Sequence, residues 1–499
     1  MLEKDTLKGK SPEKILEILG KEFENSREQN DIEKLKKAIK IANSINLEGF
    51  DNDSKSILYY FIGNAWSYIQ RIKYPKTNFE FDIEELELQV KFYRKSLSLL
   101  KKSKNKFIKC QVLTNLGNLF NDIGRIVEAQ EYFNLCLNID ANFGMALGNK
   151  GFSLFHYAKV IFEPVHQFIF LQYSRKNLLE SIQNKEVYPE AKNGFYNLIN
   201  HIESAYPTEE LDYFREYDNF YKDLTEEEIL YRKWCVKNTL FINSLNDILT
   251  QSVVANDFLC TPSITLKLNE KPIYQEMYNQ LKQEFVSARY IFYESLQNLE
   301  VHFSDKGVIL MDTMDNTFYS IYIEKMKVAF RLCYSIFDKI SYLLNEYLNL
   351  NNPPSRVSFR KVWYKNLDKR KGLNEMIINS KNWSLRGLFW LSKDLYDQDF
   401  EESIEPEAKE IAKIRNYIEH KSFKIVEKTN KNSANKITTY EIQRIEFKKK
   451  TLKLLKLSRS ALMYLSYLIY QEENKRNTKL ENEIILPLEF LNVNDKNRI

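Results

Sequence analysis

Turn-forming residues are scarce in this chain. Its 499 residues include only 13 glycines and 11 prolines, well below the average usage of about 7% and 5%. Sheets need frequent tight turns, in which these two residues are favoured. The scarcity argues against a sheet-rich fold and predicts an all-α one. The length predicts two or three domains, because a single core rarely grows so large.

Cysteine is also scarce, and its spacing fits no known metal site. The chain has five cysteines, an odd number, and no two stand at a metal-ligand spacing. They are Cys110, Cys136, Cys235, Cys260 and Cys333. This pattern predicts reduced thiols and no disulfide framework. The sequence has no HExxH motif, paired CxxC or glycine-rich dinucleotide turn either, so we expect neither a metal nor another cofactor.

Long apolar runs are missing as well. The densest, from Ala461 to Tyr470, is about half the roughly 20 residues needed to cross a bilayer. The first residues, Met1 to Asp5, lead directly into charged sequence and do not resemble a secretion signal. We therefore expect a cytoplasmic protein that does not enter a membrane. The net charge of +5 permits an RNA partner without specifying one, because a local basic patch matters more than the sum.

Residues 1–206 read as helical hairpins in series, and the clearest hairpin runs from Cys110 to Phe143. Gly117 and Ala129 would let its two helices approach closely, and Gly124 would end the first helix. The next helix repeats the spacing of these residues. Leu147, Gly151 and Leu154 follow Leu113, Gly117 and Phe120 by 34 residues each. That period and spacing resemble the tetratricopeptide (TPR) repeat. We expect a TPR-like solenoid with a curved surface for a protein or peptide; a generic helical bundle is the alternative.

The pattern turns irregular from residue 207 to 271, which we interpret as a connector that packs on both neighbours. A short helix is expected to begin at Thr225, with Glu228 as its capping partner.

Residues 272–475 are predicted to be helical again, and 476–499 to form a tail. The expected helices span 274–299, 322–347, 384–396 and 446–473. The last is apolar nearly all round between Ala461 and Tyr470, which is typical of a helix in the middle of a bundle. Pro406 would occupy the first turn of a further helix. Residues 423–426 and 438–442 could pair as a small β-hairpin.

That further helix carries Arg415-Asn416-Tyr417-Ile418-Glu419-His420. Arginine holds phosphate oxygens with a forked, permanently charged donor set, and histidine exchanges protons near neutrality. Positions five apart on a helix differ by about 140° in direction, so Arg415 and His420 of one chain would not share a face. Either the helix ends near Glu419 and turns His420 round, or the site uses two chains. Alternatively, Arg415 simply pairs with Glu419 and His420 is favoured by the helix dipole.

A helical bundle with Arg-Asn-x-x-x-His on a late helix resembles the HEPN superfamily, in particular the bacterial branch that joins TPR-like repeats to a C-terminal HEPN domain. The resemblance rests on residues 280–294, 329–344, 385–395, 414–420 and 451–465. It implies a homodimeric, metal-independent endoribonuclease in anti-phage defence or toxin-like growth arrest. Some toxin members carry a tyrosine two residues after the histidine. Ser422 stands here instead, so regulation through that tyrosine cannot occur.

The resemblance also implies roles for Arg415, Asn416 and His420. His420 would take the proton of a ribose 2′-OH or protonate the leaving 5′-oxygen, Arg415 would stabilise the charge on the phosphorus, and Asn416 would orient one of them. The products would be a 2′,3′-cyclic phosphate and a 5′-hydroxyl. A non-catalytic adaptor that dimerises and binds RNA or protein is the alternative.

Two basic stretches could add contacts to RNA. The first stretch supplies Arg360 and Lys361 as candidate RNA contacts. Lys421, beside the motif, is a third candidate. The first stretch combines Arg356, Arg360, Lys361, Lys365, Lys369, Arg370 and Lys371 with Phe359, Trp363 and Tyr364. Such a mixture suits phosphate contact and base stacking, although a solvated loop with buried aromatics would look the same. The second is a helical stripe of Lys449, Lys453 and Lys456, which could equally be a wet outer face.

Overall fold

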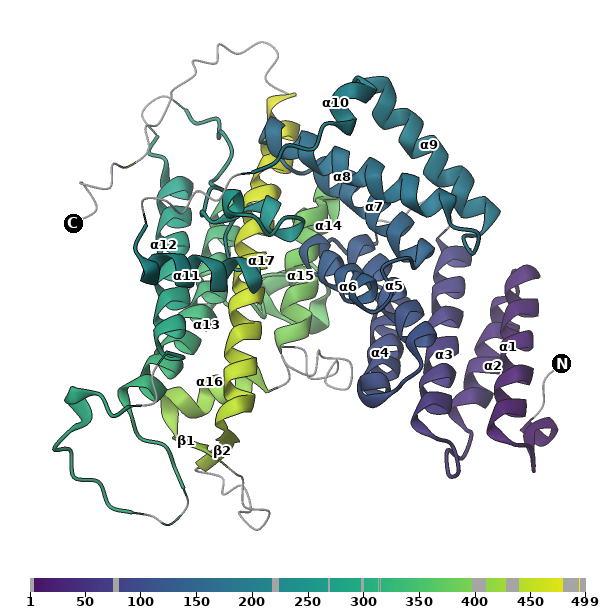
Figure 1. Cartoon of the computed structure of the whole chain (residues 1–499), viewed down its shortest axis with the longest axis horizontal. Helices are drawn as coiled ribbons and strands as arrows, with labels where there is room; N and C mark the ends of the chain where they lie inside the picture. Colours follow the sequence, from purple (N-terminus) through teal and green to yellow (C-terminus); the bar gives the residue numbers. More distant parts are fainter. Residues whose placement is uncertain are drawn as a thin grey trace.

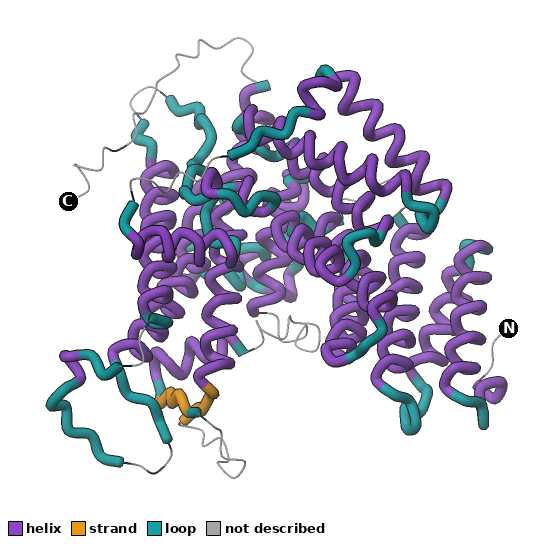
Figure 2. The backbone as a smooth tube through the Cα atoms, viewed as in Figure 1, coloured by secondary structure: helices purple, strands orange, loops and turns teal. Residues whose placement is uncertain are grey.

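The computed structural model describes residues 4–74, 80–217, 224–267, 270–297, 300–312, 314, 316–396, 410–427, 439–478 and 493. The fold is all-α, as the sequence predicts, and the described part of the chain has a single two-stranded sheet (Figure 2). Short 3-10 turns join several helices: η1 (Lys4–Leu7), η2 (Leu100–Lys102), η3 (Ser244–Asp247), η4 (Ser252–Val254), η5 (Phe303–Asp305), η6 (Pro354–Arg356), η7 (Lys365–Leu367) and η8 (Lys369–Lys371).

The N-terminal part is a row of helical hairpins (Figure 1). Its helices are α1 (Pro12–Glu28), α2 (Ile32–Asn43), α3 (Asn52–Lys73), α4 (Glu84–Leu99), α5 (Lys106–Asp122), α6 (Ile126–Ile139), α7 (Gly144–Ala158), α8 (Pro164–Gln183) and α9 (Pro189–Ala205). A Cβ at Gly117 would lie 2.6 Å from the ring of Phe133, so the close approach of α5 and α6 requires glycine. The assignment of these hairpins to the TPR family stays a prediction.

The predicted connector contains α10 (Thr208–Asp212) and α11 (Glu226–Lys237). Thr225 and Glu228 form the expected capping box at the start of α11. The carboxylate of Asp247 accepts a hydrogen bond from Tyr157 of α7 at 2.8 Å and one from Arg459 of the C-terminal bundle at 2.7 Å. This segment therefore does pack on both neighbours.

The C-terminal bundle is built around one central helix. It comprises α12 (Ile273–Glu294), α13 (Ile321–Tyr347), α14 (Glu375–Ser380), α15 (Trp383–Tyr396), α16 (Ile411–His420) and α17 (Arg444–Asn477). Helix α17 contacts α12, α13 and α15, and every residue from Ala461 to Ile469 is buried. This confirms the central helix expected from its all-round apolar pattern. No described helix has the length and apolar character that a membrane crossing requires.

The small sheet corrects one expectation. β1 (Ser422–Val426) and β2 (Thr439–Gln443) pair in parallel, with Ser422 opposite Thr439, and so do not form a hairpin. Parallel strands need a connection of about a dozen residues, and residues 427–438 provide that length. The alternating apolar pattern that identified both strands carries no information on their direction. Pro406 and most of the predicted tail lie outside the described residues.

The two halves share one hydrophobic core and a buried ion network. A single apolar cluster runs from Phe81 to Ile469. Within it, Arg94 of α4 donates to both carboxylate oxygens of Asp394 on α15, at 2.6 and 2.8 Å. Arg125, just before α6, binds the same carboxylate and also Glu128. Since all four side chains are at least 95% buried, the hairpins and the bundle are joined by charges that water does not reach.

Two glycines set the closeness of this junction. Gly124, at a φ of +83°, lies between α5 and α6, and a Cβ there would overlap the carbonyl oxygen of Trp383. A Cβ on Gly387 of α15 would overlap the carbonyl oxygen of Gly124 in turn. Both backbones would have to shift, because a carbonyl cannot rotate away as a flexible side chain can.

We therefore expect Gly387→Ala to lower the free energy of unfolding by about 1–3 kcal/mol, the usual range for overpacking. Gly194→Ala on α9 is the matched control, since a Cβ added at this glycine would have no atom within 4 Å. That variant should gain about 0.5–1 kcal/mol from the helix propensity of alanine. Urea denaturation of both proteins measures the difference, and equal midpoints would show that the junction is not closely packed.

Candidate active site

Helix α16 is fixed against the bundle by its apolar face. Ile411 and Ile414 are fully buried, and the helix contacts α13, α15 and both strands. At its start, the carboxylate of Glu410 accepts a hydrogen bond from the hydroxyl of Tyr440 at 2.7 Å and lies 3.8 Å from Lys450. The direction in which each side chain of the motif points is therefore set by the core.

Arg415 and His420 point in different directions from this helix. His420 is the last residue of the helix, so of the two alternatives, a helix that ends before His420 and turns it round is not seen. Around the helix axis, Arg415 lies about 40° from the buried Ile411, and His420 lies about 180° from it. Accordingly, Arg415 is half-buried at the edge of the packed face, whereas Asn416 and His420 are exposed. Within one chain, the structure does not bring the predicted phosphate clamp and proton carrier onto one face.

The guanidinium of Arg415 rests on an aromatic ring. Its Cζ lies 5.4 Å from the ring centroid of Tyr334 on α13, within the range of a cation–π contact. Among the described residues, Arg415 makes no ion pair, so the pair with Glu419 that was the alternative for it does not form. The ring thus contacts the charge from one side, and no described carboxylate lies within ion-pair distance of its forked donors.

Two residues around Arg415 were missed by the sequence reasoning. The ring of Tyr334 lies 5.8 Å from that of Tyr396 at the end of α15, and Asp338 follows Tyr334 by one turn. Burial raises the pKa of Asp338, while the backbone amide of Phe359 and the charge of Arg415 oppose the rise. The available signal was weak: Tyr334 and Asp338 are polar groups at a four-residue step beside the apolar stripe of α13.

One residue of the first basic stretch, Arg360, affects the same tyrosine as Arg415 does. Burial raises the pKa of Tyr334 to about 12, and the charges of Arg415 and Arg360 both act to lower it. Both Arg360 and Lys361 are exposed. Phe359, Trp363 and Tyr364 are buried in the core instead and are not available for base stacking. The alternative of a solvated loop with buried aromatics is confirmed for these three rings.

The second basic stretch is divided between the surface and a contact with α6. Lys449 is exposed and pairs with Glu446 of its own helix at 3.0 Å. Lys456 binds Glu131 of α6 at 2.9 Å, and the buried Lys453 lies 3.5 Å from the same carboxylate. Burial favours a high pKa for Glu131, but the charges of Lys456 and Lys453 lower it to about 2. The pairing of these two lysines with α6 could not be seen in the sequence of α17 alone.

Exposed cations lie at both ends of α16. The Nζ atom of Lys421 lies 4.9 Å from the ring of Tyr417, and that of Lys413, in the first turn, lies 4.8 Å from the ring of Tyr440. Both lysines are exposed, and Lys421 directly follows His420. The aromatic contact of Lys421 orients its charge beside the exposed histidine, where it could meet a phosphate backbone.

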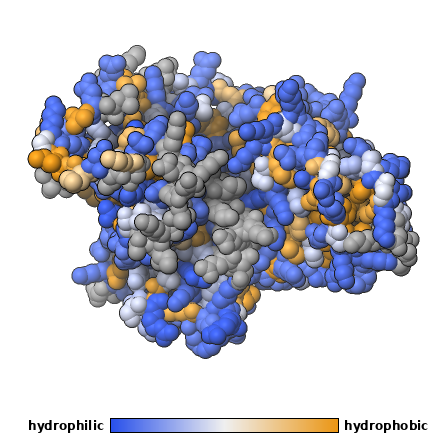
Figure 3. All heavy atoms as spheres, turned by 90° about the horizontal axis from the view of Figure 1, so that it is seen from below, coloured by the Kyte–Doolittle hydropathy of each residue, from blue (hydrophilic) through white to orange (hydrophobic). Residues whose placement is uncertain are grey.

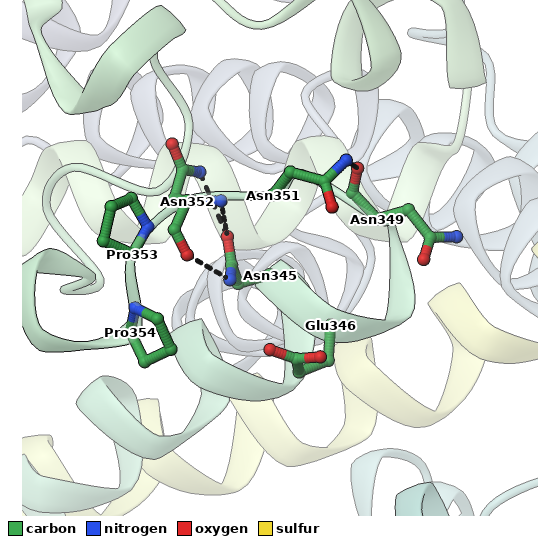
Figure 4. Close-up of a pocket in the computed structure, with 7 residues that line it drawn as sticks. All are labelled: Asn345, Glu346, Asn349, Asn351, Asn352, Pro353 and Pro354. Carbon is green, nitrogen blue, oxygen red and sulfur yellow. Dashed lines mark hydrogen bonds between the residues drawn. The ribbon is translucent and has the colours of Figure 1, made fainter.

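A surface hollow lies away from this helix. It measures about 350 Å³, lies at the C-terminal end of α13 and is lined by Asn345, Glu346, Asn349, Asn351, Asn352, Pro353 and Pro354 (Figure 4). The side-chain amide of Asn345 donates to the backbone carbonyl of Asn352 at 3.0 Å and closes the turn. Asn345 is about 10 Å along the helix axis from Asp338, and no predicted site residue lines the hollow. In the described ranges, no cluster of three or more His, Cys, Asp or Glu side chains could hold a metal ion.

Comparison with known proteins identifies the C-terminal part. Residues 265–472 match a family model described as LA2681-like HEPN. That range contains α12 to α16, both strands and nearly all of α17, and the N-terminal hairpins lie outside it. No curated protein and no solved structure gives a significant match to the chain. Residues 265–472 of this protein are therefore similar to a HEPN-family domain.

Proposed function

We propose that the chain is an endoribonuclease of HEPN type, with Arg415, Asn416 and His420 as its catalytic residues. The observation that carries the proposal is the setting of Arg415 within the HEPN-family domain. Its guanidinium rests on Tyr334 and makes no ion pair among the described residues, while His420 is exposed at the end of the same helix. A structural arginine would normally bind a nearby carboxylate, as Arg94 and Arg125 do.

The reaction needs only what these side chains supply. The ribose 2′-oxygen attacks the adjacent phosphorus, and the bond from phosphorus to the 5′-oxygen breaks. One histidine takes the 2′-OH proton or gives a proton to the leaving oxygen. Arg415 binds the phosphate oxygens as negative charge builds up on them. The products are a 2′,3′-cyclic phosphate and a 5′-hydroxyl, and DNA, which lacks the attacking group, is not cleaved.

Two copies of the chain complete this site. Because Arg415 and His420 of one α16 diverge by about 140°, one phosphate cannot easily contact both. A two-fold axis that faces two α16 helices would place residues of both chains around one substrate. The proposed active form is therefore a homodimer through the HEPN-family domain, with Lys421, Arg360 and Lys361 as further RNA contacts.

The N-terminal hairpins are the proposed place of control, in anti-phage defence or toxin-like growth arrest. They contact α15 and α17 through buried side chains: Tyr464 binds Glu128, and Lys393 binds Asp82 at 2.6 Å. A protein or peptide trigger that bends the hairpins would therefore displace helices of the nuclease domain directly. The other candidate function is a HEPN adaptor that binds RNA or protein without cleaving it.

The test is incubation of the purified full-length protein with total cellular RNA in EDTA, followed by mapping of the new ends. We expect cyclic-phosphate and 5′-hydroxyl ends. An oligonucleotide with a single 2′-deoxy residue at the mapped site should resist cleavage there. Binding of RNA without cleavage, with and without lysate from phage-infected cells, would favour the adaptor. Cleavage at the deoxy position would contradict attack by the 2′-oxygen.

A further inference from the structure

The loop between α12 and α13 exposes an unusual run of apolar side chains. Val308, Ile309, Leu310 and Met311 are consecutive and each more than half exposed, with Ile309 at 94% and Met311 at 86%. Met314 and Phe303 in the same loop are also exposed. Four consecutive exposed apolar residues are unfavourable in water unless they have a function, and contiguous apolar patches commonly mark interaction sites. We call Phe303 to Met311 together with Met314 the apolar loop.

The base of the apolar loop is fixed beside the candidate active site. At one end, the carboxylate of Asp305 accepts a hydrogen bond from the first backbone amide of α13 at 2.9 Å. At the other, the amide of Phe318 donates to the carbonyl of Ile425 in β1 at 2.8 Å, and Thr317 bridges to Val426. The loop projects beside β1 and β2 at the lower left of Figure 1. Hydrophobic residues gather at the left edge of the molecule in Figure 3.

The charge of the apolar loop disfavours RNA as its partner. Lys306 is the one cation of the loop, and residues 307–317 contain no lysine or arginine. Asp312, between Met311 and Met314, is exposed. A segment with a single lysine can neutralise few phosphates, which dominate the affinity for nucleic acids. An apolar tip beside an acidic group fits a protein surface that combines apolar and basic side chains.

A second copy of this chain offers such a surface at the right place. In that copy, exposed Lys413 lies in the first turn of α16 next to the ring of Tyr440, and exposed Lys421 follows the last residue next to the ring of Tyr417. The apolar loop is bonded to β1, which begins two residues after His420. Two copies whose α16 helices face each other would therefore each have the other's loop within reach.

We propose that the apolar loop is a docking surface for a second copy of the chain and contacts the α16–β1 region of that copy. This inference rests on the proposed function, because that function requires two α16 helices to face each other. In the isologous dimer each loop contacts the opposite copy. Apolar burial at the loop tips supplies affinity, and Asp312 opposite the lysines favours one register.

The first test measures association independently of catalysis. Sedimentation velocity of the full-length protein should show a dimer. Ile309→Asp/Met311→Asp should be monomeric at the same concentration, with an unchanged melting temperature. The control is Val165→Asp/Met376→Asp, which places the same charges at exposed apolar positions on α8 and α14 and should stay dimeric. A monomeric wild type, or a loop variant that remains dimeric, overturns the proposal. If the loop variant remains dimeric but no longer binds RNA, the loop is an RNA contact instead.

The second test does not depend on how that variant folds. A photo-crosslinking residue at position 309 is placed in an equal mixture of ¹⁴N- and ¹⁵N-labelled protein. We expect crosslinked peptides of mixed label that map to residues 410–427, and crosslinks confined to one label overturn the proposal. Mixed crosslinks without RNA cleavage would leave this proposal standing and count against the nuclease. RNA cleavage by a protein whose crosslinks are all confined to one label would support the nuclease and overturn the docking proposal.

Discussion

His420→Ala is expected to reduce kcat/KM for RNA cleavage by about 10²–10⁴-fold, the range for loss of a general acid or base. Arg415→Ala should cost about 10²–10³-fold, comparable to the loss of one oxyanion donor. Arg415→Lys keeps the charge but not the planar fork that binds two phosphate oxygens, so it should recover only part of the rate. A short RNA with one mapped cleavage site gives these constants directly.

The chain offers a matched control for each of these variants. His201→Ala removes an exposed histidine of α9, and Arg27→Ala removes an arginine of α1 that pairs with Glu24. Neither belongs to the proposed site, so both should cleave at the wild-type rate. Over-expression gives a cellular readout: wild type should slow growth, and His420→Ala should not. Cleavage that is equal in the wild type and all five variants would point to another active site or to a contaminant.

Asp394→Ala is expected to destabilise the whole chain by about 3–5 kcal/mol. Removal of one partner of a buried ion pair leaves an uncompensated charge in the core, and here both Arg94 and Arg125 lose their shared carboxylate. Because Asp394 belongs to α15 and the arginines to the hairpin region, the loss should also separate the unfolding of the two halves. Urea denaturation followed by circular dichroism should then show two transitions where wild type shows one.

An exposed ion pair provides the comparison. Glu375 and Lys365 are paired at 2.7 Å but largely exposed, so Glu375→Ala should cost no more than about 1 kcal/mol. If Asp394→Ala were equally mild, the buried network would not hold the halves together. The N-terminal hairpins would then have to act on the C-terminal bundle by another route.

The stabilisation from Asp394 should depend on pH in the acid range. Burial would raise the pKa of this carboxyl, but the charges of Arg94 and Arg125 outweigh it and lower the pKa to about 2. In the unfolded chain the value is about 3.9. A depressed pKa stabilises the fold above the unfolded value, and this contribution is lost as pH falls from about 4 to about 2. The difference between wild type and Asp394→Ala should therefore narrow across that window.

Local patterns predicted much of the fold. The helices of the bundle, the capping box at Thr225 and the central position of α17 follow from periodicity and nearby residues. The need for glycine at position 117 follows from the same local reading, because close helix packing admits no larger side chain. The candidate residues of α16 could be found in the same way, since Arg415, Asn416 and His420 are a short motif with recognisable chemistry.

Long-range packing decided the rest. The parallel direction of β1 and β2, the burial of Trp363 and the pairing of Lys453 with Glu131 depend on neighbours far away in sequence. The contact between Arg415 and Tyr334, and the ion pair between Arg94 and Asp394, join residues about 80 and 300 positions apart and leave no local pattern. By itself, the sequence determined which segments are helices and which side chains are candidates for the proposed site. Only the tertiary structure decided which charges are buried and in which direction Arg415 and His420 point, because both depend on which helix covers which face.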